Sequence, residues 1–123
     1  EMEFGVGIHG EPGRKREKIQ PSKTIVGNIL DAILDNLKPE NNEKILLFVN
    51  GMGGTPLTEL YLVYDDAFQI LQSKGVEVTR SLVGNYCTSL EMQGASITVL
   101  KCDEKILKNW DAPVHTAAMR WGM

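Results

Sequence analysis

His9 is the residue of this sequence best placed to act on a small molecule. It ends the alternating segment from Glu3 to His9, which predicts a strand, and a Gly-Glu-Pro-Gly turn follows it. Ligands of α/β sheets prefer the carboxyl ends of strands, and a neutral imidazole there can act as a base or a nucleophile. A single histidine is also often structural, and Glu11 is too close in sequence to be assigned as its orienting partner. Position alone leaves both roles open.

Two glycine-rich segments could approach a ligand. Gly5, Gly7 and Gly10 match the letters of the dinucleotide fingerprint, but the predicted helix starts about a dozen residues later, so a dinucleotide site is disfavoured. The stretch from Asn50 to Thr55 follows an apolar strand and precedes a helix, whose free N–H groups can hold an anion. It lacks the Lys-Ser/Thr end of a phosphate loop, so a tight turn and a ligand- or partner-contacting loop both stay open.

The remaining reactive residue types give little support to other sites. Cys87, at the end of one predicted strand, and Cys102, in another, are interpreted as buried free thiols. Two histidines and no Cys-x-x-Cys leave a zinc site unsupported. Asp65 and Asp66 are neighbours on a predicted helix and point in different directions, so they are not a carboxylate pair. The basic stretch of residues 14–18, with Lys23, is interpreted as solvated, and a docking surface for an acidic partner is the alternative.

Length and composition bound the class of protein. The chain has 123 residues, of which 42% are hydrophobic and 24% charged, which fits one ordinary globular domain. A net charge of -3 gives no reason to expect nucleic-acid binding. The longest strongly apolar run, residues 45–49, is far shorter than the roughly 18 residues of a membrane helix, so no membrane is expected. We expect a cytoplasmic location.

The elements that must position His9 alternate between strands and helices. After the first strand and a loop over residues 10–21, a helix is predicted from Ser22, its N-cap, to Leu37, before Pro39. Residues 45–49 are apolar throughout, as in a strand buried on both faces. Thr55 is expected to cap a helix that runs to about Lys74. The further predictions are strands from Val76 to Tyr86 and from Ala95 to Cys102, and a short helix from Asp103 to Trp110.

This order predicts a two-layer α/β domain with a mixed, mostly parallel sheet and crossover helices. The last strand is expected to be antiparallel, because its connection is short. Polar residues alternate in the outer strands, so one sheet face is either solvated or covered by another domain. The buried face of the second helix is expected to consist of Leu57, Leu60, Tyr61, Tyr64, Phe68 and Leu71.

Four blocks together resemble the substrate-binding (DhaK-type) subunit of dihydroxyacetone kinase. They occur in the family's order and cover nearly all of this chain. The resemblance implies that residues 1–123 form a single domain and are a C-terminal fragment of a larger subunit. The expected fold is that of the C-terminal domain of DhaK-type subunits. The blocks are Glu3 to Gly13, Leu46 to Tyr61, Val83 to Thr98 and Trp110 to Thr116.

The resemblance also implies a role for His9. In this family the histidine of the Gly-Ile-His-Gly-Glu-Pro motif attacks the ketone carbon of dihydroxyacetone and forms a covalent hemiaminal, and His9 matches it, with Gly10 and Glu11 as substrate-binding neighbours. A covalent bond to a carbonyl selects ketones over glycerol, and the attacking nitrogen must be unprotonated. The implied enzyme is dihydroxyacetone (glycerone) kinase. The fragment alone is expected to be inactive, because the family's other catalytic groups lie in the absent N-terminal part.

The resemblance sets the expected partners. No cofactor is expected on this chain, while nucleotide and magnesium are expected on a separate kinase subunit or domain. The ending of the chain favours a stand-alone subunit of a phosphoenolpyruvate phosphotransferase system, and a homodimer is expected. The alternative is a non-catalytic dihydroxyacetone-binding paralogue that acts as coactivator of a transcriptional regulator, which would keep His9.

Overall fold

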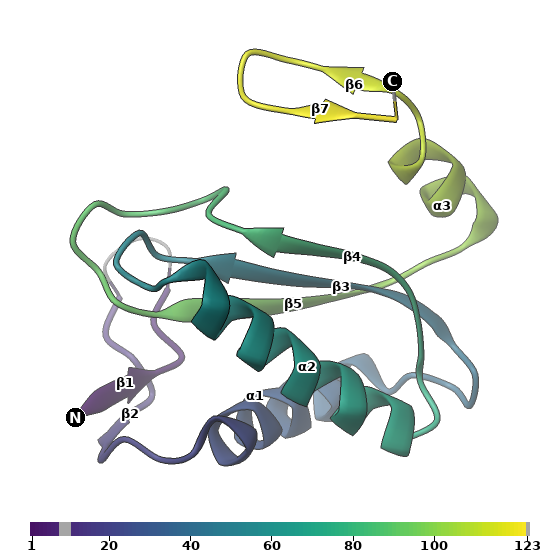
Figure 1. Ribbon diagram of the computed structural model, residues 1–123. Coiled ribbons are helices and arrows are strands. Elements are labelled where there is room, and N and C mark those ends of the chain that lie inside the picture. The colour runs from purple at the N-terminus through teal and green to yellow at the C-terminus, as the bar shows by residue number, and fades with distance from the viewer. Residues whose placement is uncertain (8–10, 123) are drawn as a thin grey trace.

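The centre of the molecule is a mixed three-stranded sheet with two helices on one face (Figure 1). The computed structural model describes residues 1–7 and 11–122. The strands are β3 (Lys44–Gly51), β4 (Glu77–Gly84) and β5 (Ala95–Lys101), in the order β4-β3-β5. β3 pairs with β4 in parallel and with β5 in antiparallel fashion. The predictions of a two-layer α/β domain with a mixed sheet and an antiparallel last strand are confirmed.

The core lies between this sheet and the helices α1 (Ser22–Leu37) and α2 (Leu57–Ser73). Every second residue of β3 points into it, and Ile45, Leu47 and Val49 are fully buried. This apolar strand occupies the middle of the sheet, as its sequence predicts. The other buried core residues are Val26, Leu30, Ala67, Leu71 and Val76.

The helix bounds agree with prediction better than the caps do. Helix α1 begins at Ser22 and ends at Leu37, and Lys38 follows in the left-handed conformation. However, Pro21 occupies the N-cap position, its carbonyl accepting the N–H groups of Thr24 and Ile25. Ser22, predicted as the N-cap, lies one position too late for that role. Its buried hydroxyl has no hydrogen-bond partner among the described residues.

Helix α2 buries part of the predicted row: Leu60 and Leu71 are fully buried, and Tyr64 and Phe68 pack against the core. Pro56 is its N-cap, and Leu60, Ala67 and Leu71 face the core together with Asp66. Leu57 and Tyr61, both predicted as buried, are 49% and 54% exposed. Because α2 is apolar on more than one side, its periodicity could not decide which side the sheet would cover.

The N-terminal segment differs from the predicted long first strand. β1 covers only Met2–Phe4 and pairs in antiparallel fashion with β2, Lys15–Glu17, in the region predicted as a loop. The prediction that the first strand joins the main sheet through a parallel crossover is therefore wrong, and the crossover of that sheet is β3-α2-β4. Cross-strand contacts explain the pairing. Arg16 forms an ion pair with Glu3 at 3.3 Å, and the Lys15 ammonium lies 4.8 Å from the centre of the Phe4 ring.

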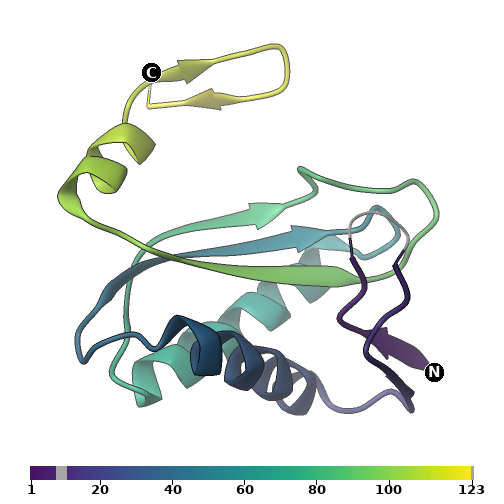
Figure 2. The same cartoon turned by 180° about the vertical axis from the view of Figure 1, so that it is seen from behind.

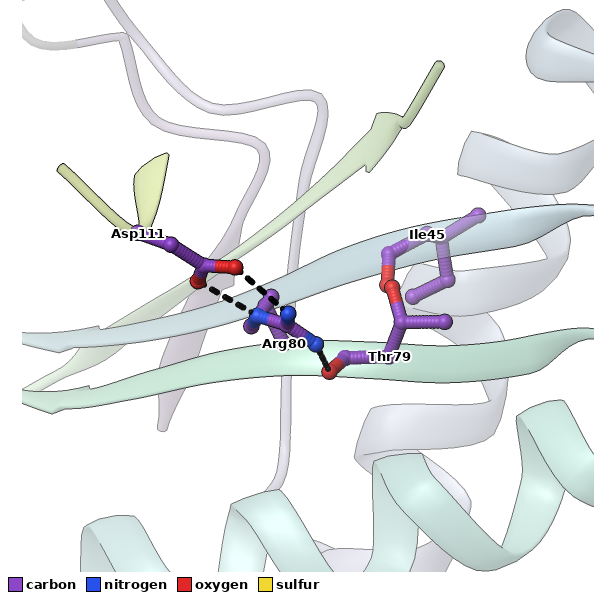
Figure 3. A network of polar contacts seen from close by, with 4 residues as sticks. All are labelled: Ile45, Thr79, Arg80 and Asp111. Carbon is purple, nitrogen blue, oxygen red and sulfur yellow. Dashed lines mark hydrogen bonds and ion pairs between the residues drawn. The ribbon is translucent and has the colours of Figure 1, made fainter. Parts of the chain in front are cut away.

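The last elements form an arm on the side of the sheet opposite α1 and α2 (Figures 1 and 2). This arm, residues 104–122, contains α3 (Glu104–Trp110) and the hairpin of β6 (Val114–His115) and β7 (Arg120–Trp121). The helix was predicted and the hairpin was not. A bidentate ion pair ties the arm to β4, because Nε and Nη2 of Arg80 donate to Asp111 at 2.7 and 2.6 Å (Figure 3).

Candidate functional site

Two loops meet at the carboxyl ends of β3 and β4, where α/β proteins place their ligands. They are the 50–56 loop, which begins with the last two residues of β3, and the 85–94 loop, which joins β4 to β5. The buried side chain of Asn50 connects them. Its Oδ1 accepts the N–H groups of Tyr86 and Cys87, both at 2.9 Å, and its Nδ2 donates to the Cys87 carbonyl at 2.7 Å. One side chain thus sets the start of the 85–94 loop.

A second connection lies at the far end of the same loops. The Thr55 hydroxyl donates to the Gly94 carbonyl at 2.8 Å and accepts the Gly94 N–H at 2.7 Å. The N–H of Gly54 donates to the Met92 carbonyl at 2.9 Å, and the N–H of Met52 to the Gly94 carbonyl at 3.0 Å. Thr55 therefore holds the loops together instead of capping α2, which corrects its predicted role. This polar network makes the pair of loops one rigid unit.

Gly53 is required where the loops touch. Its φ is +75°, a left-handed conformation that side chains rarely adopt, and a Cβ there would collide with the Ser89 carbonyl. The glycine run is thus explained by close approach of the second loop. The structure shows the turn and its contact with the 85–94 loop, while contact of this segment with a ligand or partner stays a prediction.

A small cavity of about 110 Å³ opens beside these loops. It is lined by Met52 from the 50–56 loop and by Val6 and Gly7 from the N-terminal segment. The lining combines two flexible thioethers with hydroxyls and a thiol, which suits a small molecule bearing a few polar groups. The residues from the 85–94 loop are Cys87, Thr88, Ser89 and Met92.

Gly7, which lines this cavity, comes two residues before the predicted reactive residue in the sequence. His9 and its neighbour Gly10 lie outside the described residues, so their positions are not described. Both flanks of that segment are described and lie together, because a Cβ on Gly7 would collide with the carboxylate of the exposed Glu11. The structure therefore brings Gly7 and Glu11 to one place at the edge of the sheet where the loops meet.

The two cysteines are in unlike surroundings. Cys102 is buried as predicted, and burial raises the pKa of its thiol, so it is a neutral core residue. Cys87 was predicted to be buried in a strand but lies exposed in the 85–94 loop. The strand prediction ran past the end of β4 at Gly84, after which the chain is held by Asn50 instead of by a sheet ladder. Sequence reasoning missed this anchoring role of Asn50, because residue type gives no sign of a partner so distant in sequence.

The other sequence candidates do not join this cavity. Gly5 follows β1 with φ of +70°, and the chain then continues through β2 before α1 starts at Ser22, so the geometry of a dinucleotide fingerprint is not formed. Asp65 is exposed and accepts a hydrogen bond from Gln69, while Asp66 is buried, so the two are not a carboxylate pair. An open depression of about 400 Å³ lies at the opposite end of β4, next to Gly75 and Glu77.

Two properties of the described residues bear on metal binding and on membrane insertion. No group of three or more His, Cys, Asp or Glu side chains there has the arrangement of a metal site. None of the described helices has the length and apolar character needed to cross a membrane.

The chain is similar in sequence to subunits of known kinases. The dihydroxyacetone-binding subunit DhaK of the PEP-dependent dihydroxyacetone kinase of Escherichia coli K12 is 40% identical over 99% of this chain and 41% of its own length. The DhaK subunit of PTS-dependent dihydroxyacetone kinase 1 of Listeria innocua is 46% identical over 96% of this chain and 36% of its own length. The chain thus spans about two fifths of these relatives.

Solved structures agree. A structure described as "Regulation of the dha operon of Lactococcus lactis" matches 97% of this chain and 38% of its own, with a TM-score of 0.88 and 35% identity. The "dihydroxyacetone kinase operon co-activator Dha-DhaQ" matches 90% of this chain and 35% of its own, with a TM-score of 0.82 and 36% identity. A structure described as "dihydroxyacetone kinase from C. freundii in complex with AMP-PNP and Mg2+" matches 95% of this chain and 21% of its own, with a TM-score of 0.73 and 28% identity. A family model, the Dak1 domain, matches residues 1–118. The chain belongs to the Dak1 domain family, which includes the dihydroxyacetone-binding subunits of dihydroxyacetone kinases.

Proposed function

We propose that this chain is the C-terminal part of a dihydroxyacetone-binding kinase subunit that holds its substrate covalently on His9. One observation carries the proposal: the cavity of about 110 Å³ lies beside residues that directly precede the His9 segment, in a chain up to 46% identical to dihydroxyacetone-binding subunits. The cavity suits a triose, and its Thr88 and Ser89 hydroxyls can pair with substrate hydroxyls. Gly10 and Glu11 would contact the substrate.

The covalent step balances without a further reactant. The unprotonated imidazole nitrogen of His9 attacks the ketone carbon, and the carbonyl π electrons move to the oxygen, which takes up a proton as the ring loses its N–H proton. The product is a hemiaminal, and nothing leaves. Glycerol has similar hydroxyls but no electrophilic carbon, so the same site discriminates against it. Because the attacking nitrogen must be unprotonated, capture should weaken as the pH falls.

Phosphorylation to dihydroxyacetone phosphate would need parts outside this chain. Nucleotide and magnesium would belong to a partner kinase subunit, with phosphate supplied by the phosphoenolpyruvate-dependent relay named for the bacterial relatives. The chain alone would therefore phosphorylate nothing. The subunit would work in the cytoplasm and as a homodimer.

The test uses the full-length subunit and the two histidines of the sequence as a matched pair. Incubation with dihydroxyacetone should raise the intact mass by the whole mass of the ketone, because addition expels no water. His9→Ala should abolish this adduct, and His115→Ala should keep it, since His115 lies in β6 of the arm and contacts Arg120. An adduct that survives in His9→Ala would disprove the covalent role.

A second function is favoured by the match to the coactivator Dha-DhaQ, whose TM-score is 0.82. A non-catalytic paralogue that binds dihydroxyacetone and acts on a transcriptional regulator would also form the His9 adduct. The two functions separate when the nucleotide-carrying subunit and a phosphate source are added to the loaded subunit. Dihydroxyacetone phosphate as product supports the kinase, whereas an adduct without phosphorylated product supports the coactivator.

A further inference from the structure

The basic stretch that follows the Gly-Glu-Pro-Gly turn combines paired and unpaired cations. The Lys15 ammonium lies 3.2 Å from the carboxylate of Glu17, and the Arg16 guanidinium lies 3.3 Å from that of Glu3. Arg14 is exposed and forms an ion pair with none of the other residues that the structure describes. Two of these three charges are therefore balanced locally, whereas the charge of Arg14 is available to a ligand.

The position of Arg14 is fixed by its backbone and by the stem of its side chain. Its N–H donates to the carbonyl of Phe4 at 2.6 Å. Gly5 leaves room for the stem, since a Cβ there would lie 3.1 Å from Cγ and 3.3 Å from Cδ of Arg14. Gly5 directly precedes Val6 and Gly7, which line the cavity of about 110 Å³. Arg14 thus packs against the residue next to the cavity wall.

A charge of opposite sign lies next to the same wall. The carboxylate of Glu11 occupies the space that a Cβ on Gly7 would need. A carboxylate accepts hydrogen bonds from hydroxyl groups and repels a phosphate, whereas a guanidinium offers a planar fork of donors that matches two phosphate oxygens. Glu11 and Arg14 therefore offer separate contacts for the hydroxyl groups and for the phosphate of one phosphorylated polyol.

We propose that Arg14 binds the phosphate group that takes part in the reaction, while the cavity holds the carbon chain. This inference rests on the proposed function, because the phosphate is taken to belong to dihydroxyacetone phosphate or to the phosphoryl donor. Both sources present the same anionic oxygens. The guanidinium donates two parallel hydrogen bonds to these oxygens and balances their charge, which a chain with a net charge of -3 does not do elsewhere beside Glu11.

Glycerol 3-phosphate is the probe, because it carries the phosphate but has no ketone that could react with His9. Its dissociation constant is measured with the full-length subunit by calorimetry at low ionic strength, since salt screens exposed charges. Arg14→Gln should weaken binding by about tenfold or more, because charge-assisted hydrogen bonds are lost. Arg16→Gln is the matched control and should bind almost as wild type does, since Arg16 is paired with Glu3. Arg14→Lys keeps the charge without the fork and should lose less affinity, and it replaces Arg14→Gln if that variant does not fold.

A second measurement separates the two sources of the phosphate. The kcat of phosphorylation is measured with the nucleotide-carrying subunit, a phosphate source and saturating dihydroxyacetone. Weaker binding of glycerol 3-phosphate assigns Arg14 to the phosphate of the product, and a lower kcat with unchanged binding assigns it to the phosphate of the donor. If nothing is phosphorylated, calorimetry decides alone. The proposal is overturned if Arg14→Gln matches Arg16→Gln in every measurement.

Mass spectrometry of the dihydroxyacetone adduct in the same variants separates this inference from the proposed function. Absence of the adduct in the wild-type subunit would count against the covalent role of His9, and the binding of glycerol 3-phosphate would still test Arg14. A wild-type adduct together with equal results for Arg14→Gln and Arg16→Gln would remove only the role of Arg14. If Arg14→Gln lost the adduct and the phosphate ester to the same extent, general damage to the site would explain both losses and the proposal would fail.

Discussion

Asn50 and Cys87 are joined by hydrogen bonds in both directions across 37 residues of sequence. The Cys87 N–H donates to Asn50 Oδ1, and Asn50 Nδ2 donates to the Cys87 carbonyl. The amide of Asn50 is 4% exposed, so these bonds form away from water. Because Cys87 lines the cavity, a buried amide at the end of β3 controls the wall of the candidate site.

Removing this amide should loosen that wall. Asn50→Ala leaves the N–H groups of Tyr86 and Cys87 and the Cys87 carbonyl without their partner, at a cost of about 1–3 kcal/mol in unfolding free energy. We expect weaker dihydroxyacetone binding by the full-length subunit, measured by calorimetry. Asn36→Ala is the control, because the Asn36 amide donates from the exposed surface of α1. Equal binding by both variants would show that Asn50 does not position the site.

The hydroxyl of Thr55 should matter more than its methyl group. Thr55→Val keeps the shape of the side chain but loses both hydrogen bonds to Gly94, so we expect a loss of about 1–2 kcal/mol in urea unfolding. Thr55→Ser keeps the hydroxyl and should retain most of the stability. If serine and valine destabilised the protein equally, packing of the methyl group would be the cause instead.

Two glycine-to-alanine changes should have opposite signs. At Gly53 the φ of +75° and the nearby Ser89 carbonyl oppose a Cβ, so Gly53→Ala should destabilise the protein by about 1 kcal/mol or more. Gly27 lies within α1, where a new Cβ would meet only the end of the Ile70 side chain at 3.9 Å. Gly27→Ala should therefore stabilise by about 0.5–1 kcal/mol. Thermal unfolding of both variants measures the difference, and a shared sign would contradict it.

Acid should release the arm through Asp111. The Arg80 guanidinium holds the pKa of the Asp111 carboxyl below its usual range. Because this folded-state pKa is depressed, the ion pair contributes fully to the stability of the folded state above about pH 4. That contribution is lost as the pH falls through the lower pKa of the folded state. Trp110 and Trp121 are the only tryptophans, so fluorescence reports on the arm alone.

The comparison variant for this titration is Asp111→Asn, which cannot ionise. Wild-type fluorescence should change below about pH 4, and the variant should already show the released signal at neutral pH. Superimposable titrations of the two proteins would mean that the ion pair does not hold the arm.

Local patterns predicted much of the secondary structure. Helix α1 occupies the predicted residues, because its apolar positions recur with helical spacing and Lys38 and Pro39 end it. The prediction for the N-terminal region was wrong, since β2 is a short charged strand without apolar alternation that pairs with β1. The hairpin at Val114–His115 escaped prediction for a similar reason, because two-residue strands have no measurable period.

The candidate site divides in the same way. The sequence predicted one side of the candidate site, because the 50–56 loop is rich in glycine and comes after an apolar strand. The exposure of the Cys87 thiol and the way the 85–94 loop is held against the 50–56 loop could not be predicted, because both depend on side-chain hydrogen bonds across 37 and 39 residues. Such hydrogen bonds form only when the folded chain brings donor and acceptor together. The residue type of an asparagine or threonine does not reveal whether they form.

By itself the sequence determined the succession of main helices and strands, the central buried strand and the family resemblance through its motifs. The tertiary structure decided which face of α2 is buried, where β1 pairs, how the two loops meet and where the arm stands. The physical reason is that hydrophobic periodicity acts within a turn or a pleat and can be read locally. Loop contacts and strand partners instead depend on distant segments that meet only when the core between α1, α2 and the sheet has formed.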